Sequence, residues 1–298
     1  MKRLLLTIAA SLLAAAAFAQ DPHADHQMAT ISVSTANTSV SQDWAKKKVD
    51  ASPRHHEWVN LKSGTRTVSA FVVYPEVKAK APSVVVIHEI FGMSDWVQML
   101  ADEVAEAGNI AIAPDLLSGM GPNGGGTASF ADGTAVGKAI RDLPPDQITA
   151  DLNAAADYVS KLPAANGKVA VAGFCWGGTQ SFRFATNRPS LSAAYVFYGT
   201  SPESPEEIAK IKAPVYGFYA GNDARVGATL PKTIELMKAA KKTFEPVKYA
   251  GAGHGFMRAG ETPPPPADAD QKILDAYASN KKARDEAWVR WKGLLRKL

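Results

Sequence analysis

Short apolar runs alternate with amphipathic stretches along most of this chain, and this alternation constrains the fold more than any other feature. The apolar runs are SVVVIHE (83–89), NIAIAPDLL (109–117), GKVAVAGF (167–174), SAAYVFYG (192–199), APVYGFYAG (213–221) and FEPVKYAG (244–251). Continuous apolar character is typical of strands buried on both faces of a sheet. Strands that alternate with helices favour a parallel sheet covered on both faces. We therefore expect one α/β domain over residues 53–298.

The remaining elements follow from turn and helix signals. HEWVNLKS (56–63) and TVSAFVVYP (67–75) alternate apolar and polar residues, which predicts a hairpin at a sheet edge. The Gly-rich stretch 118–133 predicts a loop, and prolines at both ends of 144–163 favour a helix there. The other expected helices cover 95–108, a segment from Gly177, a short segment near Glu206, 229–242 and 282–295.

The first residues have the features of a signal peptide. Lys2 and Arg3 precede an apolar core, and Ala17-Phe18-Ala19 offers a small-residue cleavage site. The core is short and rich in alanine, which favours cleavage after Ala19 over a membrane anchor. We therefore predict that residues 1–19 are removed and that the protein is periplasmic or secreted, with no membrane association after cleavage.

Residues 20–52 predict a mobile N-terminal arm, because they are rich in Ser, Thr and Ala and lack a sustained period. We expect His23, Asp25 and His26 in this arm to be solvated rather than to bind a metal ion. The formal net charge falls from +4 to +2 when the two basic residues of the signal peptide are lost. So modest a charge gives no reason to expect nucleic-acid binding. We expect no metal and no organic cofactor.

Cys175 is the only cysteine of the chain. An exported protein with a single cysteine has no intramolecular disulfide, which leaves a small core residue or a reactive thiol. Its context, Gly173-Phe-Cys-Trp-Gly177-Gly178, follows a predicted strand and precedes a predicted helix. This is the G-x-S-x-G nucleophile elbow with cysteine in place of serine, and the helix N-terminus favours a thiolate. We therefore interpret Cys175 as a nucleophile, with core packing as the alternative.

Two further residues follow strands in the positions that this chemistry needs. Asp223 comes after VYGFYAGN and His254 after PVKYAGAG. Because chemistry in such sheets gathers beyond the carboxyl ends of the strands, we expect His254 to act as the base and Asp223 to orient it. Taken singly, Asp223 also fits a turn residue and His254 a loop histidine. These alternatives explain less well why both residues stand at the places that the chemistry needs.

An acyl-transfer site also needs donors for a developing oxyanion. The elbow geometry predicts the backbone N–H groups of Trp176 and, in the loop after the strand 83–89, Ile90. Glu89 stands in this loop, where it is either solvated or faces the thiol.

The segments HEIFG, GFCWGG, GNDARV and GHGFMR, in this order between about residues 55 and 258, resemble the dienelactone hydrolase family. This is a cysteine branch of the α/β-hydrolases, so the resemblance implies the α/β-hydrolase fold with a mostly parallel central sheet and helices on both faces. It implies a triad of Cys175, Asp223 and His254, and an acid, Glu89, that contacts the cysteine and that we expect to keep the thiol protonated until substrate enters. It also implies an oxyanion hole from the same two amides.

The resemblance implies substrate-binding arginines as well. Arg258, four residues after His254, matches an arginine that binds the substrate carboxylate in this family; its alternative is a surface salt bridge. The family's second arginine lies in a segment that corresponds here to the Gly-rich loop through Asp132, which does not align. Arg141 is a candidate for that role.

These observations predict an exported hydrolase that cleaves a small-molecule ester or lactone through a thioester acyl-enzyme. The alternative is a non-catalytic ligand-binding member of the same fold. A thiol redox protein is a weaker fit, because the chain lacks C-x-x-C spacing and a resolving cysteine.

Overall fold

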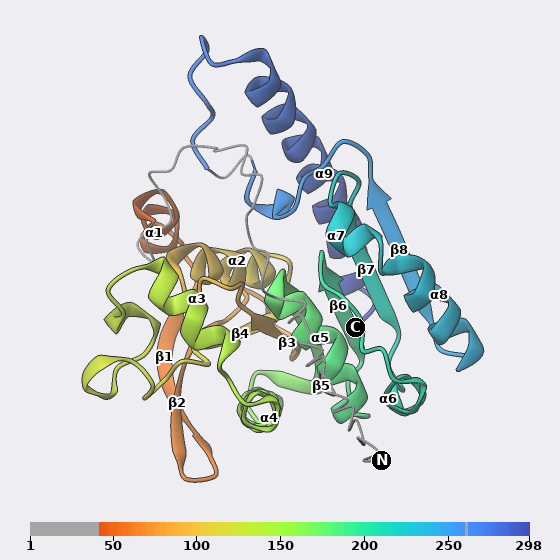
Figure 1. The fold of residues 1–298 in the computed structure, drawn as a ribbon. Coiled ribbons are helices and arrows are strands. Elements are labelled where there is room, and N and C mark those ends of the chain that lie inside the picture. The colour runs from red at the N-terminus through yellow and green to blue at the C-terminus, as the bar shows by residue number, and fades with distance from the viewer. Residues whose placement is uncertain (1–41, 260–261) are drawn as a thin grey trace, which may run out of the picture. The chain divides into compact units, whose positions relative to one another are not determined.

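An eight-stranded sheet lies at the centre of the computed structural model, which describes residues 42–259 and 262–298 (Figure 1). The strands are β1 (His56–Ser63), β2 (Arg66–Val73), β3 (Ala81–Ile87), β4 (Ile110–Pro114), β5 (Ala165–Phe174), β6 (Ala193–Phe197), β7 (Val215–Ala220) and β8 (Phe244–Tyr249). Their order in the sheet is β1-β2-β4-β3-β5-β6-β7-β8. Strand β2 pairs antiparallel with both β1 and β4, and the other five strand pairs are parallel, so the predicted mostly parallel sheet is confirmed.

Strands β1 and β2 form the predicted hairpin at one edge of the sheet. Ser63 pairs with Arg66 across a two-residue turn, and Gly64 adopts a φ of +58° there. A two-residue turn of this kind needs a positive φ, which glycine adopts without strain.

Helices cover both faces of the sheet (Figure 1). They are α1 (Asp43–Asp50), α2 (Asp95–Glu106), α3 (Gly133–Arg141), α4 (Pro145–Ser160), α5 (Trp176–Asn187), α6 (Pro205–Lys210), α7 (Ala224–Gly227), α8 (Leu230–Ala239) and α9 (Gln271–Leu295). Short 3₁₀ turns are η2 (Pro122–Gly124), η3 (Thr127–Ser129) and η4 (Phe256–Arg258). None of the helices in the described ranges is long and apolar enough to cross a membrane.

Alternate residues of the central strands face two separate cores. Val84 and Val86 of β3 pack with α1, α2 and α9, whereas Val85 and Ile87 pack with α3, α4, α5, α6 and α8. This explains the unbroken apolar runs in the sequence, since both faces of each inner strand are buried.

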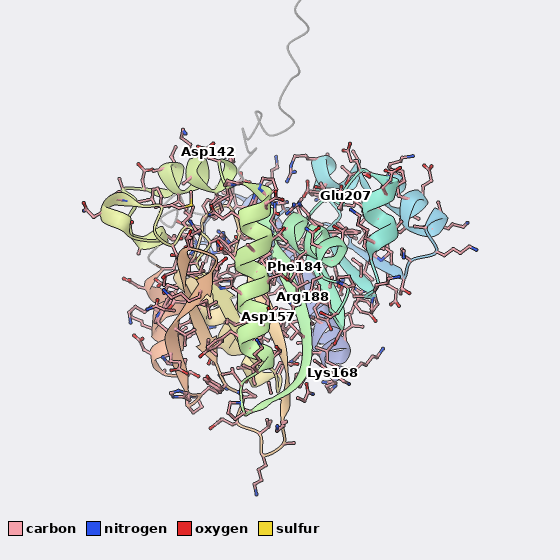
Figure 2. All side chains as sticks on the ribbon, turned by 90° about the horizontal axis from the view of Figure 1, so that it is seen from below. Asp142, Asp157, Lys168, Phe184, Arg188 and Glu207 are labelled. Carbon is pink, nitrogen blue, oxygen red and sulfur yellow. The ribbon has the colours of Figure 1, made fainter. Side chains whose placement is uncertain are left out.

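Helix α4 is tied to the end of α5 by one arginine, labelled in Figure 2. Arg188 donates to Asp157 at 2.7 Å and to Asn153 at 2.9 Å, both on α4. The contact fixes the far end of the helix whose N-terminus follows Cys175.

Helix α3 is not among the helices that the sequence predicts, and helix α9 begins earlier than predicted. Helix α3 begins inside the predicted Gly-rich loop, where Asp132 caps it by accepting a hydrogen bond from the Ala135 amide at 2.9 Å. Helix α9 begins at Gln271 rather than at residue 282, and Asp270 caps it. Acidic side chains at both caps stabilise these early starts.

The prediction of a mobile arm over residues 20–52 is wrong for its last part, where residues 43–50 form helix α1. Its Ala45 and Val49 are buried among residues of α2. The Gln42 side chain accepts a hydrogen bond from the Trp96 amide at 2.9 Å, and the Gln42 amide donates to Asp95 at 2.6 Å. Residues 42–52 therefore dock on the domain instead of forming a mobile arm. The predicted signal peptide and the rest of the arm lie outside the described residues.

Candidate active site

Cys175 lies in the sharp turn between β5 and α5. Its φ and ψ are +54° and −117°, a conformation that residues other than glycine rarely adopt. The Cys175 amide donates to the carbonyl oxygen of Phe197 on the neighbouring strand at 3.1 Å, and its carbonyl oxygen accepts from Gly178 at 2.9 Å. Surrounding hydrogen bonds thus hold the strained residue, which is the arrangement expected of a nucleophile elbow.

The glycines around Cys175 are required by close backbone approach. A Cβ on Gly173 would lie 1.8 Å from the carbonyl oxygen of Gly177, and one on Gly177 would lie 2.3 Å from that of His88. The elbow therefore packs directly against the chain that leaves β3.

A continuous chain of hydrogen bonds joins Cys175, His254 and Asp223. The His254 Nε2 lies 3.0 Å from the Cys175 Sγ, and its Nδ1 lies 2.6 Å from Asp223 Oδ2. The other carboxylate oxygen, Oδ1, accepts from the Val226 amide at 3.1 Å and so fixes the carboxylate as the cap of α7. The three predicted residues, which follow β5, β7 and β8, are brought together.

Helix α9 supports the loop that carries His254. The Gly253 amide donates to Asn280 Oδ1 of α9 at 2.7 Å, and Gly255, on the other side of His254, has a φ of +77°. The His254 ring also meets the ring of Tyr198 edge-on, with centroids 5.0 Å apart. These contacts leave the imidazole little freedom to turn.

The hydrogen bonds of His254 favour its charged form. Burial alone would lower the His254 pKa, but the bonds to Asp223 and Cys175 outweigh burial and raise it to about 10. Burial would likewise raise the pKa of Asp223, but the bond to His254 holds it below its ordinary value. The site therefore favours an Asp223 carboxylate beside a protonated imidazole.

The two predicted oxyanion donors lie in adjacent turns. Neither the Ile90 amide nor the Trp176 amide donates a hydrogen bond to another of the residues that the structure describes. Trp176 is the first residue of α5, where helix amides have no partner within the helix. His88, in the other turn, stacks on the Trp176 ring with centroids 5.6 Å apart. Within the described residues these two amides therefore have no acceptor, as donors to an oxyanion require.

Among the described residues, Glu89 and Cys175 form no hydrogen bond with one another. The Glu89 carboxylate pairs with the Arg258 guanidinium and accepts a hydrogen bond from the Tyr198 hydroxyl at 3.3 Å, whereas the thiol bonds His254. Glu89 is 3% exposed, whereas the Arg258 side chain is 24% exposed, so the carboxylate is buried and its partner is partly exposed. The structure thus gives Glu89 an ion pair with Arg258, and its expected contact with Cys175 stays a prediction.

Arg258 pairs with the buried Glu89 carboxylate and packs against two aromatic rings. Its guanidinium lies 4.7 Å from the ring centre of Phe91 and 5.3 Å from that of Trp96. Burial opposes the charge of Arg258, but the Glu89 carboxylate more than compensates and holds the pKa above its ordinary value. The predicted binding of a substrate carboxylate would require Arg258 to share or leave this pair.

A family model described as "Dienelactone hydrolase family" matches residues 68–298. The chain belongs to the dienelactone hydrolase family. The family and the hydrolase class predicted from the sequence are thereby confirmed.

Relatives of this dienelactone hydrolase family member include two proteins named "Putative carboxymethylenebutenolidase". The one from Salmonella typhi is 32% identical over 212 residues, which cover 66% of this chain and 77% of the relative. The one from Saccharolobus solfataricus is 30% identical over 262 residues, which cover 78% and 94%. The crystal structure of a protein named "Putative Dienelactone Hydrolase", from Klebsiella pneumoniae subsp. pneumoniae MGH 78578, has a TM-score of 0.68 at 24% identity and covers 82% of this chain and 99% of the other. The α/β-hydrolase fold is therefore shown.

One residue of this dienelactone hydrolase site was not predicted from the sequence. Tyr198 follows β6, is fully buried and has a φ of +40°. Burial, with the nearby Glu89, raises its pKa well above the ordinary value, so its hydroxyl stays a donor. The available signal was its place directly after a strand at the same sheet edge, but the apolar run 192–199 continues past the end of β6 and hides the point where the strand ends.

Arg141, the other candidate arginine, is exposed at the end of α3. A Cβ placed on Gly137 of this helix would lie 3.7 Å from both the Arg141 guanidinium and the Ile90 carbonyl oxygen. Arg141 is thus carried by the helix that borders the Ile90 turn. Within residues 42–259 and 262–298, no group of His, Cys, Asp and Glu is arranged to hold a metal ion.

Proposed function

We propose that this protein hydrolyses a small-molecule ester or lactone through a thioester on Cys175. The observation that carries the proposal is the hydrogen-bonded chain from Asp223 through His254 to the sulfur, at 2.6 and 3.0 Å. A nucleophile, a base and an orienting acid in this order are the parts that acyl transfer needs.

In the first half-reaction the sulfur attacks the carbonyl carbon of the substrate while its proton resides on His254. The negative charge that develops on the carbonyl oxygen is stabilised by the Ile90 and Trp176 amides. The tetrahedral intermediate collapses as the C–O bond breaks, and His254 gives its proton to the leaving alkoxide. A thioester of Cys175 and an alcohol result; with a lactone the alcohol remains tethered to the acyl group.

In the second half-reaction a water molecule attacks the thioester carbon. His254 takes a proton from this water, and the same two amides stabilise the second oxyanion. Cleavage of the C–S bond then releases the carboxylic acid and leaves the sulfur beside the protonated His254, as at the start of the cycle. Asp223 holds the imidazole in one tautomer throughout and stabilises its charge.

We also propose that the enzyme acts after export. The supporting observations are the basic start, the apolar core and the small-residue site that ends at Ala19. A single cysteine suits such a compartment, because the nucleophile has no second thiol in its own chain with which to form a disulfide.

The test is a rate measurement on a panel of aryl esters and lactones. We expect Cys175→Ala to lower kcat/KM by about 10³-fold or more, and Asp223→Asn to lower it strongly with the fold retained. Lys281→Ala, on the exposed face of α9, is the control and should be unaffected. An unchanged rate in Cys175→Ala would end the proposal, and binding without turnover across the panel would favour a ligand-binding protein.

A further inference from the structure

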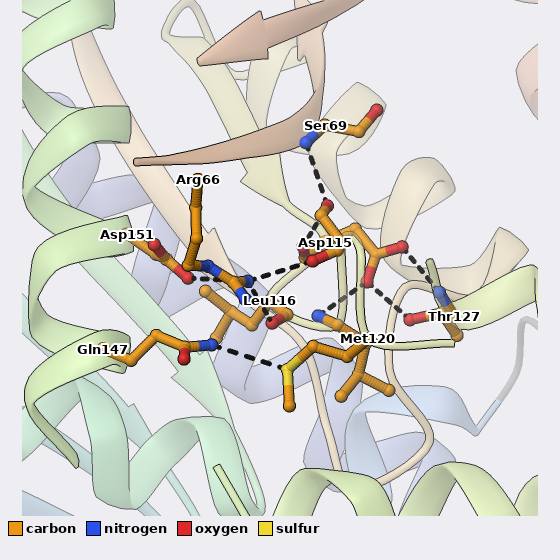
Figure 3. A network of polar contacts seen from close by, with 10 residues as sticks. Arg66, Ser69, Asp115, Leu116, Met120, Thr127, Gln147 and Asp151 are labelled. Carbon is orange, nitrogen blue, oxygen red and sulfur yellow. Dashed lines mark hydrogen bonds and ion pairs between the residues drawn. The ribbon is translucent and has the colours of Figure 1, made fainter. Parts of the chain in front are cut away.

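The Gly-rich segment 118–132, between β4 and α3, has no part in the chemistry described so far. A buried carboxylate at its start, Asp115, organises it (Figure 3). Asp115 Oδ1 accepts from the Leu117 amide at 3.1 Å and from the Thr127 hydroxyl at 2.6 Å, and Oδ2 accepts from the Thr127 amide at 2.8 Å. Three donors on one buried carboxylate make a strong, directional anchor.

The anchor is itself attached to the sheet. The Ser118 hydroxyl donates to the Asp115 carbonyl oxygen at 2.6 Å and accepts from the Ser69 amide of β2 at 2.9 Å. Arg66 of β2 donates to the Ser118 carbonyl oxygen at 3.1 Å. A Cβ on Gly126 would lie 2.2 Å from the Asp115 carboxylate, so glycine is required there. Thr127 is thereby held at a fixed place.

Thr127 makes a second contact on its other side. Its hydroxyl oxygen accepts a hydrogen bond from the Met93 amide at 3.1 Å, and the residue is fully buried. Gly92, with a φ of +69°, approaches so closely that a Cβ on it would lie 2.6 Å from the Thr127 side chain. The hydroxyl thus joins Asp115, to which it donates, to the turn that follows β3.

That turn carries one of the expected oxyanion donors. The Gly92 amide donates to the Glu89 carbonyl oxygen at 3.1 Å and closes a four-residue turn in which Ile90 is the second residue. The Thr127 contact fixes the end of this turn, and the strand β3 fixes its start.

We propose that Thr127, held by Asp115, is a positioning residue that fixes the turn from Glu89 to Met93 and with it the Ile90 amide. The inference rests on the proposed function, because the Ile90 amide matters only if an oxyanion forms beside it. Oxyanion stabilisation depends on donors that are placed before the reaction, so a small displacement of one donor lowers the rate of acyl transfer. The Gly-rich segment then stabilises the turn that carries the Ile90 amide.

Two substitutions at this position separate the hydroxyl from the shape of the side chain. Thr127→Val keeps the branched shape but leaves the Asp115 carboxylate and the Met93 amide without this partner. Thr127→Ser keeps the hydroxyl and loses only a methyl group. Asp115→Asn weakens the hydrogen bonds between residue 115 and Thr127, and it replaces Thr127→Val in the experiment if that variant does not fold. Thr186→Val is the matched control, since Thr186 is also buried with a hydroxyl bonded at 2.8 Å, but lies at the end of α5 remote from Cys175.

The experiment measures ester hydrolysis, alkylation of Cys175 by iodoacetamide and amide hydrogen exchange of residues 89–93. For Thr127→Val we expect kcat to fall on the order of 10- to 100-fold with KM little changed, a share of the loss that removal of one whole oxyanion donor causes. Exchange in the turn should become faster, while the alkylation rate stays within about two-fold of wild type because the thiol and imidazole are not touched. Thr127→Ser and Thr186→Val should keep kcat within a few-fold.

The outcomes distinguish this inference from the proposed function. Unchanged exchange in residues 89–93 of Thr127→Val, or of Asp115→Asn if that variant takes its place, overturns the inference whatever the activity. The inference is also overturned if Thr127→Ser loses as much kcat as Thr127→Val, because the hydroxyl is then not the cause. It is overturned as well if the alkylation rate of Thr127→Val falls as far as its kcat, because the substitution then disturbs the whole site. A wild-type protein with no activity on any ester or lactone contradicts the proposed function, and hydrogen exchange still decides whether Thr127 holds the turn.

Discussion

The protonation of His254 is set by its two hydrogen-bond partners. The arrangement assigns the Nδ1 proton to the bond with Asp223 and leaves Nε2 facing the sulfur. Because these bonds outweigh burial, the pKa of His254 lies at about 10 in the folded protein, above its ordinary value of 6.5. Between pH 6.5 and about 10, His254 therefore stays protonated in the folded protein but is deprotonated in the unfolded chain.

This difference predicts how stability changes with pH. The contribution of His254 is fully present below about pH 6.5 and is lost as the pH rises toward 10. Asp223→Asn removes the carboxylate that raises the pKa, so the free energy of unfolding should fall less steeply between pH 6.5 and 9 in this variant than in wild type. Urea unfolding at several pH values checks the prediction, and equal slopes in the two proteins would contradict it.

Asp223, the carboxylate partner of His254, contributes to stability at acidic pH. Its folded pKa lies below the ordinary value of 3.8, so its contribution is present above that pH and is lost as the pH falls through the folded value. The triad is therefore expected to stabilise the fold most between about pH 4 and 6.5.

At the scale of elements, the turn from β5 into α5 depends on the absence of side chains at its glycines. A Cβ on Gly177 would lie 2.3 Å from the carbonyl oxygen of His88 and 2.5 Å from that of Ile87. Both neighbours are backbone atoms, which cannot move without displacing the end of β3. The elbow and the turn that follows β3 therefore form one packed unit.

We accordingly predict that Gly177→Ala destabilises the protein by about 2 kcal/mol or more, because the added methyl group would overlap the backbone at the end of β3. The matched control is Gly227→Ala on α7, where a Cβ would meet nothing within 4 Å. This control should be neutral or more stable by about 0.4–1 kcal/mol, since alanine restricts the unfolded chain. Chemical denaturation compares the two variants, and similar losses in both would refute the steric argument.

The strands, most helices and the elbow were predictable from the sequence, because each has a local signal. The runs at β3 and β5 are apolar on both faces, and the elbow glycines flank the junction between β5 and α5. Helix α3 was missed because its N-terminus lies in a Gly-rich stretch, although Val136 and Ile140 are spaced as a buried helix face. Helix α1 was missed because a short, highly charged segment has little helical tendency without its packing partner.

The contacts within the site were less predictable than its residues. Cys175, Asp223 and His254 could be chosen because each follows a strand, and parallel strands end at one sheet edge. The pairing of Glu89 with Arg258 joins residues that are 169 positions apart, and no local pattern in either segment specifies it. The place of Tyr198 directly after β6 was a local signal, but its contacts with Glu89 and His254 form only when the sheet is assembled.

At the scale of the whole molecule, the proposed export determines which chain performs the chemistry. We predict that the mature protein begins at Gln20, because cleavage follows Ala17-Phe18-Ala19. Mass spectrometry of the N-terminal peptide from the periplasmic or secreted fraction checks this, with Ala19→Leu as a variant that should block cleavage. Recovery of the protein in the cytoplasm with residues 1–19 attached would show that the segment is not a signal peptide.

The central claim is that acyl transfer passes through the sulfur of Cys175, and trapping the acyl-enzyme tests it most directly. The enzyme is mixed with an activated aryl ester, quenched in acid within the first turnovers and analysed by intact and peptide mass spectrometry. We expect one added acyl group per chain, located on Cys175 and absent from Cys175→Ala, which should also lose hydrolysis. An acyl group on another residue, or hydrolysis by Cys175→Ala at the wild-type rate, would contradict the claim.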